Sequence, residues 1–85
     1  MWYLYIVKCV DGSLYTGITK NVERRVTEHN LSKRGAKYTR SRRPVELVCS
    51  YAVGDTRSLA MKEERRIKKM SRSQKFNWIK SQKTV

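Results

Sequence analysis

The sequence predicts an α+β fold in a single domain over residues 1–85, and three observations support this prediction. A turn-forming dipeptide separates two β-rich runs, a later stretch alternates between apolar and polar residues, and other apolar residues recur at helical spacing. A chain of 85 residues has room for one modest core. Strands are expected at 2–10, 13–19 and 45–53, and helices at 21–31, at about 57–70, and from Ser71 through Ile79.

The first two strands form a hairpin around Asp11-Gly12, and two registers are compatible with this turn. A two-residue turn pairs Val10 with Ser13. A three-residue loop with Gly12 in the left-handed conformation pairs Cys9 with Ser13 instead. We favour the second register, because it keeps the apolar residues of both strands on one face of the sheet.

The favoured register also decides where the hairpin tyrosines lie. Tyr5 and Tyr15 share the face opposite the apolar one, and Tyr5 lies directly across from Gly17. In the other register the two tyrosines point to opposite faces. The candidate structural turn glycines are Gly12 and Gly17.

Local signals mark the ends of the later elements. Asn21 or Thr19 is the candidate N-cap of the first helix, and Ser71 is that of the last. Residues 32–44 form a basic loop with room for a helical turn, and the pair Gly54-Asp55 turns the third strand into the next helix.

The composition excludes several classes of protein. No apolar run approaches the roughly 20 residues that span a bilayer, and the start of the chain lacks the pattern of a signal peptide. Two cysteines, Cys9 and Cys49, are too few for a disulfide scaffold or a zinc site. A reduced, cytoplasmic setting fits this composition.

The charge predicts a polyanionic partner. Twenty Lys and Arg residues against seven acidic ones give a formal net charge of +13. Nucleic acid is the favoured partner, and the charge does not separate DNA, the preferred candidate, from RNA. A membrane surface is the weaker alternative, because the basic residues also crowd the middle of the chain. The residues expected to bind the substrate lie in the basic loop, where the ring of Tyr38 is available to stack on an unpaired base. Its members are Lys33, Arg34, Lys37, Tyr38, Arg40, Arg42 and Arg43.

Helical geometry selects two side chains in the first helix. At 100° per residue, Arg25 and His29 flank the apolar stripe of Val22 and Val26 and face the sheet, whereas Arg24 points almost the opposite way. Arg25 is therefore a candidate to stabilise charge on a phosphoryl group, and His29 to orient a hydroxyl or relay a proton. The alternatives are an ordinary phosphate-contact or salt-bridge arginine and a structural histidine.

The helix at 57–70 carries two adjacent acids whose roles periodicity does not separate. One buried stripe places Glu64 among apolar residues, with an ion pair to Lys68 as its simplest alternative role. A second stripe fits about as well and selects Glu63. The carboxylates of the chain are scattered, so one metal ion on one carboxylate is the more economical arrangement.

A set of ordered motifs resembles the GIY-YIG nuclease domain. Tyr5 is followed ten residues later by Tyr15-Thr16-Gly17, and then by Arg25 and His29. The resemblance continues through Gly35-Ala36-Lys37-Tyr38-Thr39-Arg40 and Arg43-Pro44-Val45 to Glu64, and so covers nearly the whole chain. It is strongest to the small stand-alone bacterial branch and to the Slx1-type nuclease domain. In two departures, Tyr3-Leu4-Tyr5 lacks the leading Gly and Thr16 replaces an aliphatic residue; neither removes a reacting group.

The resemblance implies both a fold and a chemistry. The fold is a three-stranded antiparallel sheet flanked by helices. The chemistry is phosphodiester hydrolysis with a divalent metal, Mg²⁺ or Mn²⁺, held by Glu64. Tyr5 is the favoured general base, its pKa lowered by a strongly positive site and a metal, and Tyr15 binds the water or phosphate. Their roles can be exchanged, or both can be ordinary strand tyrosines. The implied catalytic set is Tyr5, Tyr15, Arg25, His29 and Glu64.

Three functions are compatible with these residues. The first is a metal-dependent endonuclease acting on DNA, with structured or repair intermediates as candidate substrates. The second is a nucleic-acid-binding module without turnover, and the third is a nuclease subunit that cuts only with a protein partner for targeting. A pure binding module has no need of a carboxylate among so many cations, which favours the first over the second. The sequence does not separate the first from the third.

Overall fold

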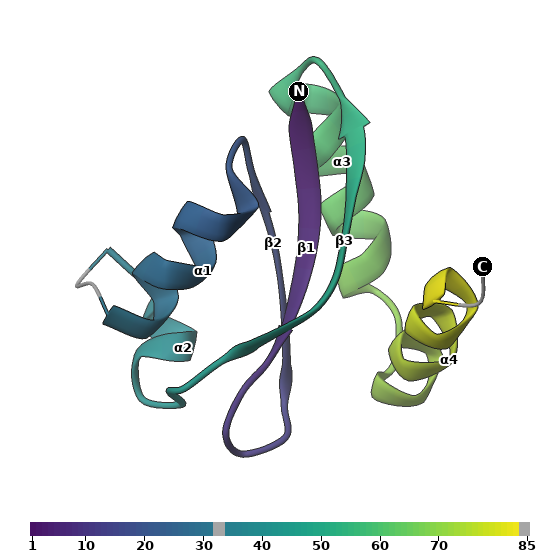
Figure 1. The fold of residues 1–85 in the computed structure, drawn as a ribbon. Coiled ribbons are helices and arrows are strands. Elements are labelled where there is room, and N and C mark those ends of the chain that lie inside the picture. The colour runs from purple at the N-terminus through teal and green to yellow at the C-terminus, as the bar shows by residue number, and fades with distance from the viewer. Residues whose placement is uncertain (32–33, 84–85) are drawn as a thin grey trace.

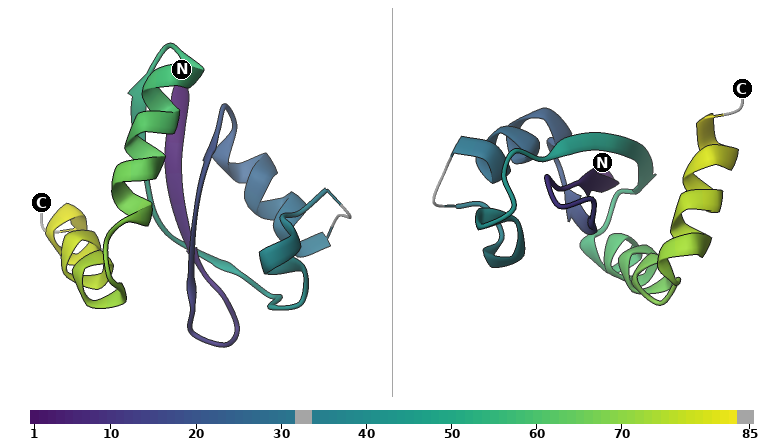
Figure 2. Two further views of the ribbon diagram at one scale, coloured as in Figure 1. Left: turned by 180° about the vertical axis from the view of Figure 1, so that it is seen from behind. Right: turned by 90° about the horizontal axis from the view of Figure 1, so that it is seen from below.

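The computed structural model describes residues 1–31 and 34–83 (Figure 1). Its sheet is fully antiparallel, with the strand order β2-β1-β3, and helices cover both faces (Figures 1 and 2). The α+β fold and the three-stranded antiparallel sheet are therefore confirmed. In chain order the elements are β1 (Trp2–Lys8), β2 (Leu14–Thr19), α1 (Val22–Leu31), α2 (Lys37–Arg40), β3 (Glu46–Gly54), α3 (Arg57–Lys68) and α4 (Arg72–Lys83).

The hairpin adopts the three-residue loop. The Cys9 N–H donates to Ser13 O at 2.8 Å, the Gly12 N–H donates to Cys9 O at 2.9 Å, and Gly12 has a φ of 85°. Tyr5 lies opposite Gly17. The favoured register is confirmed, and Gly12 is a turn glycine. Gly17 is not, because it lies inside β2 and has no positive φ; its role is described below.

Two apolar layers hold the helices against the sheet. On one face, Leu4 and Ile6 of β1 pack with Ile67 of α3 and Ile79 of α4. Alternation along β1 sends the next side chains to the other face, where Tyr5, Val7 and Cys9 pack with Val45 and with Val22 and Val26 of α1. The sheet therefore separates α1 and α2 on one side from α3 and α4 on the other (Figure 2).

The helix ends follow the capping chemistry of the sequence. Asn21 caps α1, since its Oδ1 accepts the Arg24 N–H at 3.0 Å. Ser71 caps α4 in a reciprocal pair with Gln74, in which Ser71 Oγ accepts the Gln74 N–H at 3.2 Å and Gln74 Oε1 accepts the Ser71 N–H at 2.9 Å. Thr56 caps α3 by accepting the Leu59 N–H at 3.3 Å. The helical turn expected in the basic loop is α2, and α3 ends at Lys68 rather than 70.

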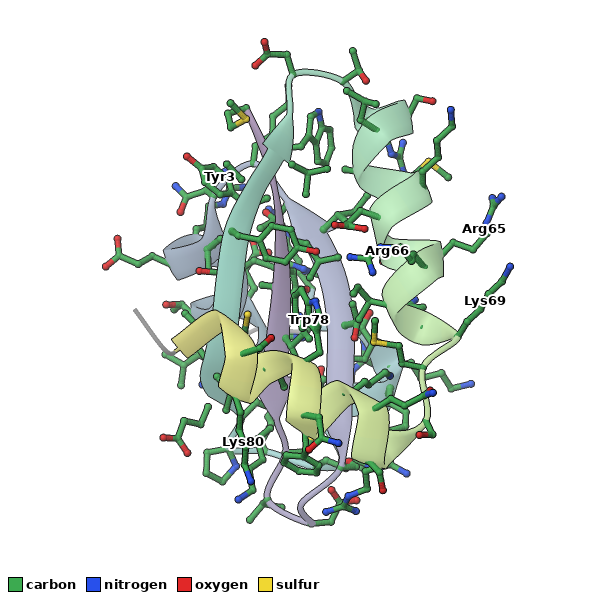
Figure 3. The ribbon with its side chains drawn as sticks, turned by 90° about the vertical axis from the view of Figure 1, so that its right-hand side faces the viewer. Tyr3, Arg65, Arg66, Lys69, Trp78 and Lys80 are labelled. Carbon is green, nitrogen blue, oxygen red and sulfur yellow. The ribbon has the colours of Figure 1, made fainter. Side chains whose placement is uncertain are left out.

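The last helix closes the apolar layer at one end. Trp78 points from α4 toward the sheet, and its ring centroid lies 5.4 Å from that of Tyr51 on β3 (Figure 3). In the part of the chain that the structure describes, no helix is both long and apolar enough to cross a membrane.

Candidate active site

Tyr5 occupies the centre of the site because Gly17 leaves space for it. Both residues lie in the middle of paired strands, and the tyrosine side chain crosses over the glycine. A Cβ atom at Gly17 would lie 2.5 Å from Tyr5 Cζ and 2.8 Å from Cε1, well inside van der Waals contact. The glycine is therefore required by close approach and not by backbone conformation.

A chain of buried hydrogen bonds fixes the Tyr5 hydroxyl. Tyr5 Oη lies 2.7 Å from His29 Nε2, and His29 Nδ1 lies 2.7 Å from Thr39 Oγ1. The Thr39 hydroxyl donates to Ala36 O at 3.0 Å, so its oxygen accepts from a protonated Nδ1. We assign His29 to this tautomer, in which Nε2 accepts the proton of Tyr5. The Ala36 N–H, at 3.4 Å from Nδ1, is the longer contact.

Burial keeps both members of the Tyr5–His29 pair neutral. It raises the pKa of Tyr5 to about 12, against a smaller opposing effect of the Arg25 guanidinium. It lowers the pKa of His29 to about 4, with the positive charge of Arg25 as the next cause. The neighbouring cation therefore does not lower the tyrosine pKa by itself, because desolvation of the buried ring outweighs it; the expected lowering depends on the metal as well.

Arg25 reaches the hydroxyl from α1, as the helical geometry predicts. Its side chain is 26% exposed, against 68% for that of Arg24, and its positive charge acts to lower the pKa of Tyr5. Its Nη1 donates to Glu28 Oε1 at 3.0 Å and to Arg34 O at 2.7 Å. These two contacts hold a cation at the edge of the site, where an incoming phosphate would meet it.

The structure separates the two adjacent acids of α3. Glu63 turns toward β3, where it accepts from the Tyr51 hydroxyl at 2.7 Å and from Arg66 Nε at 2.5 Å. Glu64 pairs with Lys68 at 3.6 Å, and Lys68 Nζ lies 5.9 Å from the centroid of the Tyr15 ring. The negative charge of Glu64 is also the smallest of the causes that act on the pKa of Tyr5. The acid chosen by resemblance is therefore the one linked to the hairpin tyrosines, and its simplest alternative role, the ion pair with Lys68, is present as well.

Tyr15 joins the cluster through its ring. The ring centroid lies 5.4 Å from that of His29 and 5.9 Å from that of Tyr38, which stacks on it. Lys68 Nζ lies 5.9 Å from the same centroid. The structure thus brings together all five side chains predicted to be catalytic, from two strands and from helices on both faces of the sheet. Lys68 and Thr39 join them. Helical spacing predicted Lys68 as the ion-pair partner of Glu64, whereas periodicity gave no signal for Thr39.

The basic loop divides into exposed and structural cations. Arg34, Lys37 and Arg40 are exposed, whereas Lys33 lies outside the described residues. Arg43 is partly buried and donates to His29 O at 2.5 Å.

Contacts of Arg42 with Tyr38 and Asp11 connect α2 to the hairpin turn. Arg42 Nε lies 3.1 Å from Asp11 Oδ2, and its guanidinium lies 4.0 Å from the centroid of the Tyr38 ring. Because Tyr15 covers the ring of Tyr38 as well, the expected stacking of Tyr38 on an unpaired base would require one of these neighbours to move.

The site offers few carboxylate ligands, so a metal ion bound there would keep water molecules as most of its ligands. Among the described residues, no group of three or more His, Cys, Asp or Glu could hold a metal. Glu64 is a single carboxylate, 23% exposed. Mg²⁺ commonly binds proteins through one or two carboxylates and keeps several waters, so this donor set fits it.

Comparison with known proteins identifies the protein family to which this arrangement of residues belongs. Residues 1–77 match the GIY-YIG catalytic domain. The chain belongs to the GIY-YIG family. Similar family members include the UPF0213 protein DP2720 of Desulfotalea psychrophila, 55% identical over 94% of this chain and 72% of that protein. Another is a UPF0213 protein of Syntrophus aciditrophicus, 55% identical over 92% of this chain and 88% of that protein.

Two solution NMR structures share this GIY-YIG fold. The UPF0213 protein BH0048 of Bacillus halodurans is 43% identical, with a TM-score of 0.58, over 94% of this chain and 84% of that one. Protein EF2693 of E. faecalis is 47% identical, with a TM-score of 0.62, over 93% of this chain and 82% of that one. Membership of the family identifies the chain as a nuclease-type domain that binds nucleic acid.

Proposed function

We propose that this protein is a metal-dependent endonuclease that hydrolyses phosphodiester bonds of DNA in the cytoplasm. The observation that carries the proposal is the cluster around Tyr5, in which His29 lies 2.7 Å from the tyrosine hydroxyl and Arg25 approaches it from α1. Glu64 joins the cluster from α3 through Lys68, which pairs with Glu64 at 3.6 Å and lies 5.9 Å from the centroid of the Tyr15 ring. A hydroxyl, a cation and a carboxylate supply the three needs of the reaction: an activated water, charge stabilisation and a metal ligand.

The hydrogen-bond chain assigns a direction to the proton. In the proposed reaction, Tyr5 Oη takes a proton from the attacking water while its own proton passes to His29 Nε2. Thr39 holds the imidazole in the tautomer that can accept it. Arg25 stabilises the charge on the phosphoryl oxygens. Because the pKa of Tyr5 is about 12 without a metal, turnover is expected to rise with pH across the neutral range.

Glu64 would hold the divalent ion, Mg²⁺ or Mn²⁺. The bound ion would supply positive charge beside the Tyr5 hydroxyl and the phosphate, which favours the tyrosinate and the leaving group. Lys68 pairs with Glu64 in the structure, so its ammonium would give up this partner when the metal binds.

A matched pair of variants tests the proposal. The purified protein is incubated with nicked, flapped, branched and single-stranded DNA, with Mg²⁺ or Mn²⁺. Glu64→Gln is expected to lower the cleavage rate at least 100-fold, as does removal of the metal with EDTA. Glu63→Gln is the control: it loses a structural acid one residue away and is expected to keep the rate and its metal dependence.

The outcomes separate the three candidate functions. Equal cleavage by wild type, Glu64→Gln and Arg25→Ala indicates a contaminant, whereas loss of cleavage in Arg25→Ala alone contradicts the role of Glu64. Tight binding by all three without cleavage favours a binding module. Cleavage that appears only when cell extract is added favours a partner-dependent subunit, and repeating that assay with Glu64→Gln shows whether the cutting centre lies on this chain.

A further inference from the structure

A cavity of about 440 Å³ lies beside the catalytic arginine, at the end of β2 between α1 and α3. These two helices belong to opposite faces of the sheet (Figures 1 and 2), and the edge strand β2 contributes Ile18 and Thr19 to the lining of the cavity. Its volume falls in the range of small-molecule sites, roughly 300–1,000 Å³. The residues of its wall that matter here are Trp2, Ile18, Lys20, Arg25, Glu28 and Arg57.

The wall of this cavity combines an aromatic ring with cations. Trp2 and Ile18 give it an apolar side, and Lys20 Nζ lies 5.4 Å from the centroid of the Trp2 ring. In the described part of the chain, neither Lys20 nor Arg57 has a carboxylate partner. Such cations beside an indole match both parts of a nucleotide, the phosphate and the base.

Arg57 stands at a position where helix electrostatics disfavours a cation. It is the first residue of α3, and the first turn of this helix contains no acid. The positive end of a helix dipole favours Asp or Glu there, by about 0.3–1 kcal/mol for an exposed residue. Helix stability therefore does not explain the arginine, whereas an anion in the adjoining cavity would.

The cavity is continuous with the catalytic cluster through two elements. Arg25 belongs to both: it lines the cavity, and its positive charge acts on the Tyr5 hydroxyl. On α3, Arg57 precedes Glu64 by seven residues, which is two turns of one helix face and about 10 Å along the axis. A strand whose phosphate reaches Arg25 therefore passes the cavity within one or two nucleotides.

We propose that this cavity binds an unpaired nucleotide next to the cleavage site, so that the preferred substrates are nucleic acids with a single-stranded flap or overhang. In a duplex both faces of a base are covered by its stacked neighbours, so only an unpaired base can lie against Trp2. Lys20 and Arg57 would then hold the phosphate of the same nucleotide. This inference rests on the proposed function for the position of the scissile bond.

The test measures binding without cleavage. In EDTA, the full chain is titrated into a fluorescently labelled blunt duplex and into the same duplex with a four-nucleotide overhang, and the anisotropy gives both Kd values. Wild type is expected to bind the overhang substrate roughly tenfold more tightly. Arg57→Gln and Trp2→Leu are expected to lose most of that preference while keeping their affinity for the blunt duplex within about threefold.

Arg65→Gln is the matched control, with the same charge change on the same helix. Arg65 and Lys69 project from α3 away from the sheet (Figure 3). The control should weaken both substrates alike and keep the preference. The inference would be overturned if Arg57→Gln and Arg65→Gln lost the preference for the overhang substrate equally, or if wild type showed no such preference. Should Trp2→Leu not fold, Arg57→Gln, which alters an exposed side chain, decides the question alone.

Cleavage is then measured separately, with Mg²⁺. If the protein prefers the overhang substrate in an Arg57-dependent way but never cuts it, the inference about the cavity holds and the proposed function is wrong. If the protein cuts blunt and overhang substrates at equal rates, and Arg57→Gln changes neither binding nor rate, the proposed function holds and the inference about the cavity is wrong.

Discussion

Replacing Gly17 by alanine tests the geometry of the site with one methyl group. The added Cβ would lie 2.5 Å from Tyr5 Cζ, and ordinary contact begins near 3.4 Å, so the ring must move by about 0.9 Å. A misplacement of about 1 Å costs a reacting group roughly 10²-fold in rate. Overpacking costs about 1–3 kcal/mol, partly offset by about 0.5–1 kcal/mol because Gly disfavours a strand. We therefore expect a net loss of about 1–2 kcal/mol in unfolding free energy and roughly 100-fold in turnover.

The assays are plasmid nicking in Mg²⁺ and urea unfolding, with a second glycine as control. Gly12→Ala places a side chain at a φ of 85°, so it costs about 1–2 kcal/mol through backbone strain but leaves Tyr5 in place. The two variants should match in stability and differ about 100-fold in rate. The ¹⁵N shift of His29 Nε2 should change in Gly17→Ala alone, because that atom accepts the Tyr5 hydroxyl. A Gly17→Ala protein with wild-type rate and an unchanged His29 signal would refute the placement of Tyr5.

Two further predictions concern stability. Thr16 Oγ1 is buried without a hydrogen-bond partner among the described residues, so Thr16→Val should raise the unfolding free energy by about 1 kcal/mol in urea; a loss of stability would show that the hydroxyl is satisfied. His29, with a pKa of about 4 folded and about 6.5 unfolded, binds protons more strongly in the unfolded chain. The contribution of His29 to the unfolding free energy is therefore fully present above pH 6.5 and falls by about 2 kcal/mol by pH 4.5. The midpoint of urea unfolding should depend less on pH over this window in His29→Gln than in wild type. An equal pH dependence in the two proteins would contradict the lowered pKa of His29.

The fold was predictable wherever local chemistry and burial agree. Only one hairpin register places Leu4 and Ile6 with the apolar residues of β2, and the structure adopts it. Helical geometry separates Arg25 from Arg24, because one face of α1 must cover the sheet. In both cases the apolar residues on the same element carry the information.

The site was less predictable where the deciding partner is distant in sequence. Glu63 and Glu64 fit helical stripes equally well, and the hydroxyl of Tyr51, twelve residues away, separates them. Arg42 looks like any other cation of the basic loop, yet its partner is Asp11, thirty-one residues away. The pKa of Tyr5 depends on how completely the folded chain covers it, which composition does not report.

The distribution of the reacting groups over both faces of the sheet bears on when the protein becomes active. Tyr5 and Arg25 leave the ribosome early, but Glu64 follows some forty residues after Arg25 and has to dock from the opposite side. Under the proposed function, a nascent or partly unfolded chain would therefore hold DNA through its many cations without cutting it. Hydrolysis in the proposed reaction begins only once the second helical layer has closed, so completion of the fold is itself the safeguard against premature cleavage.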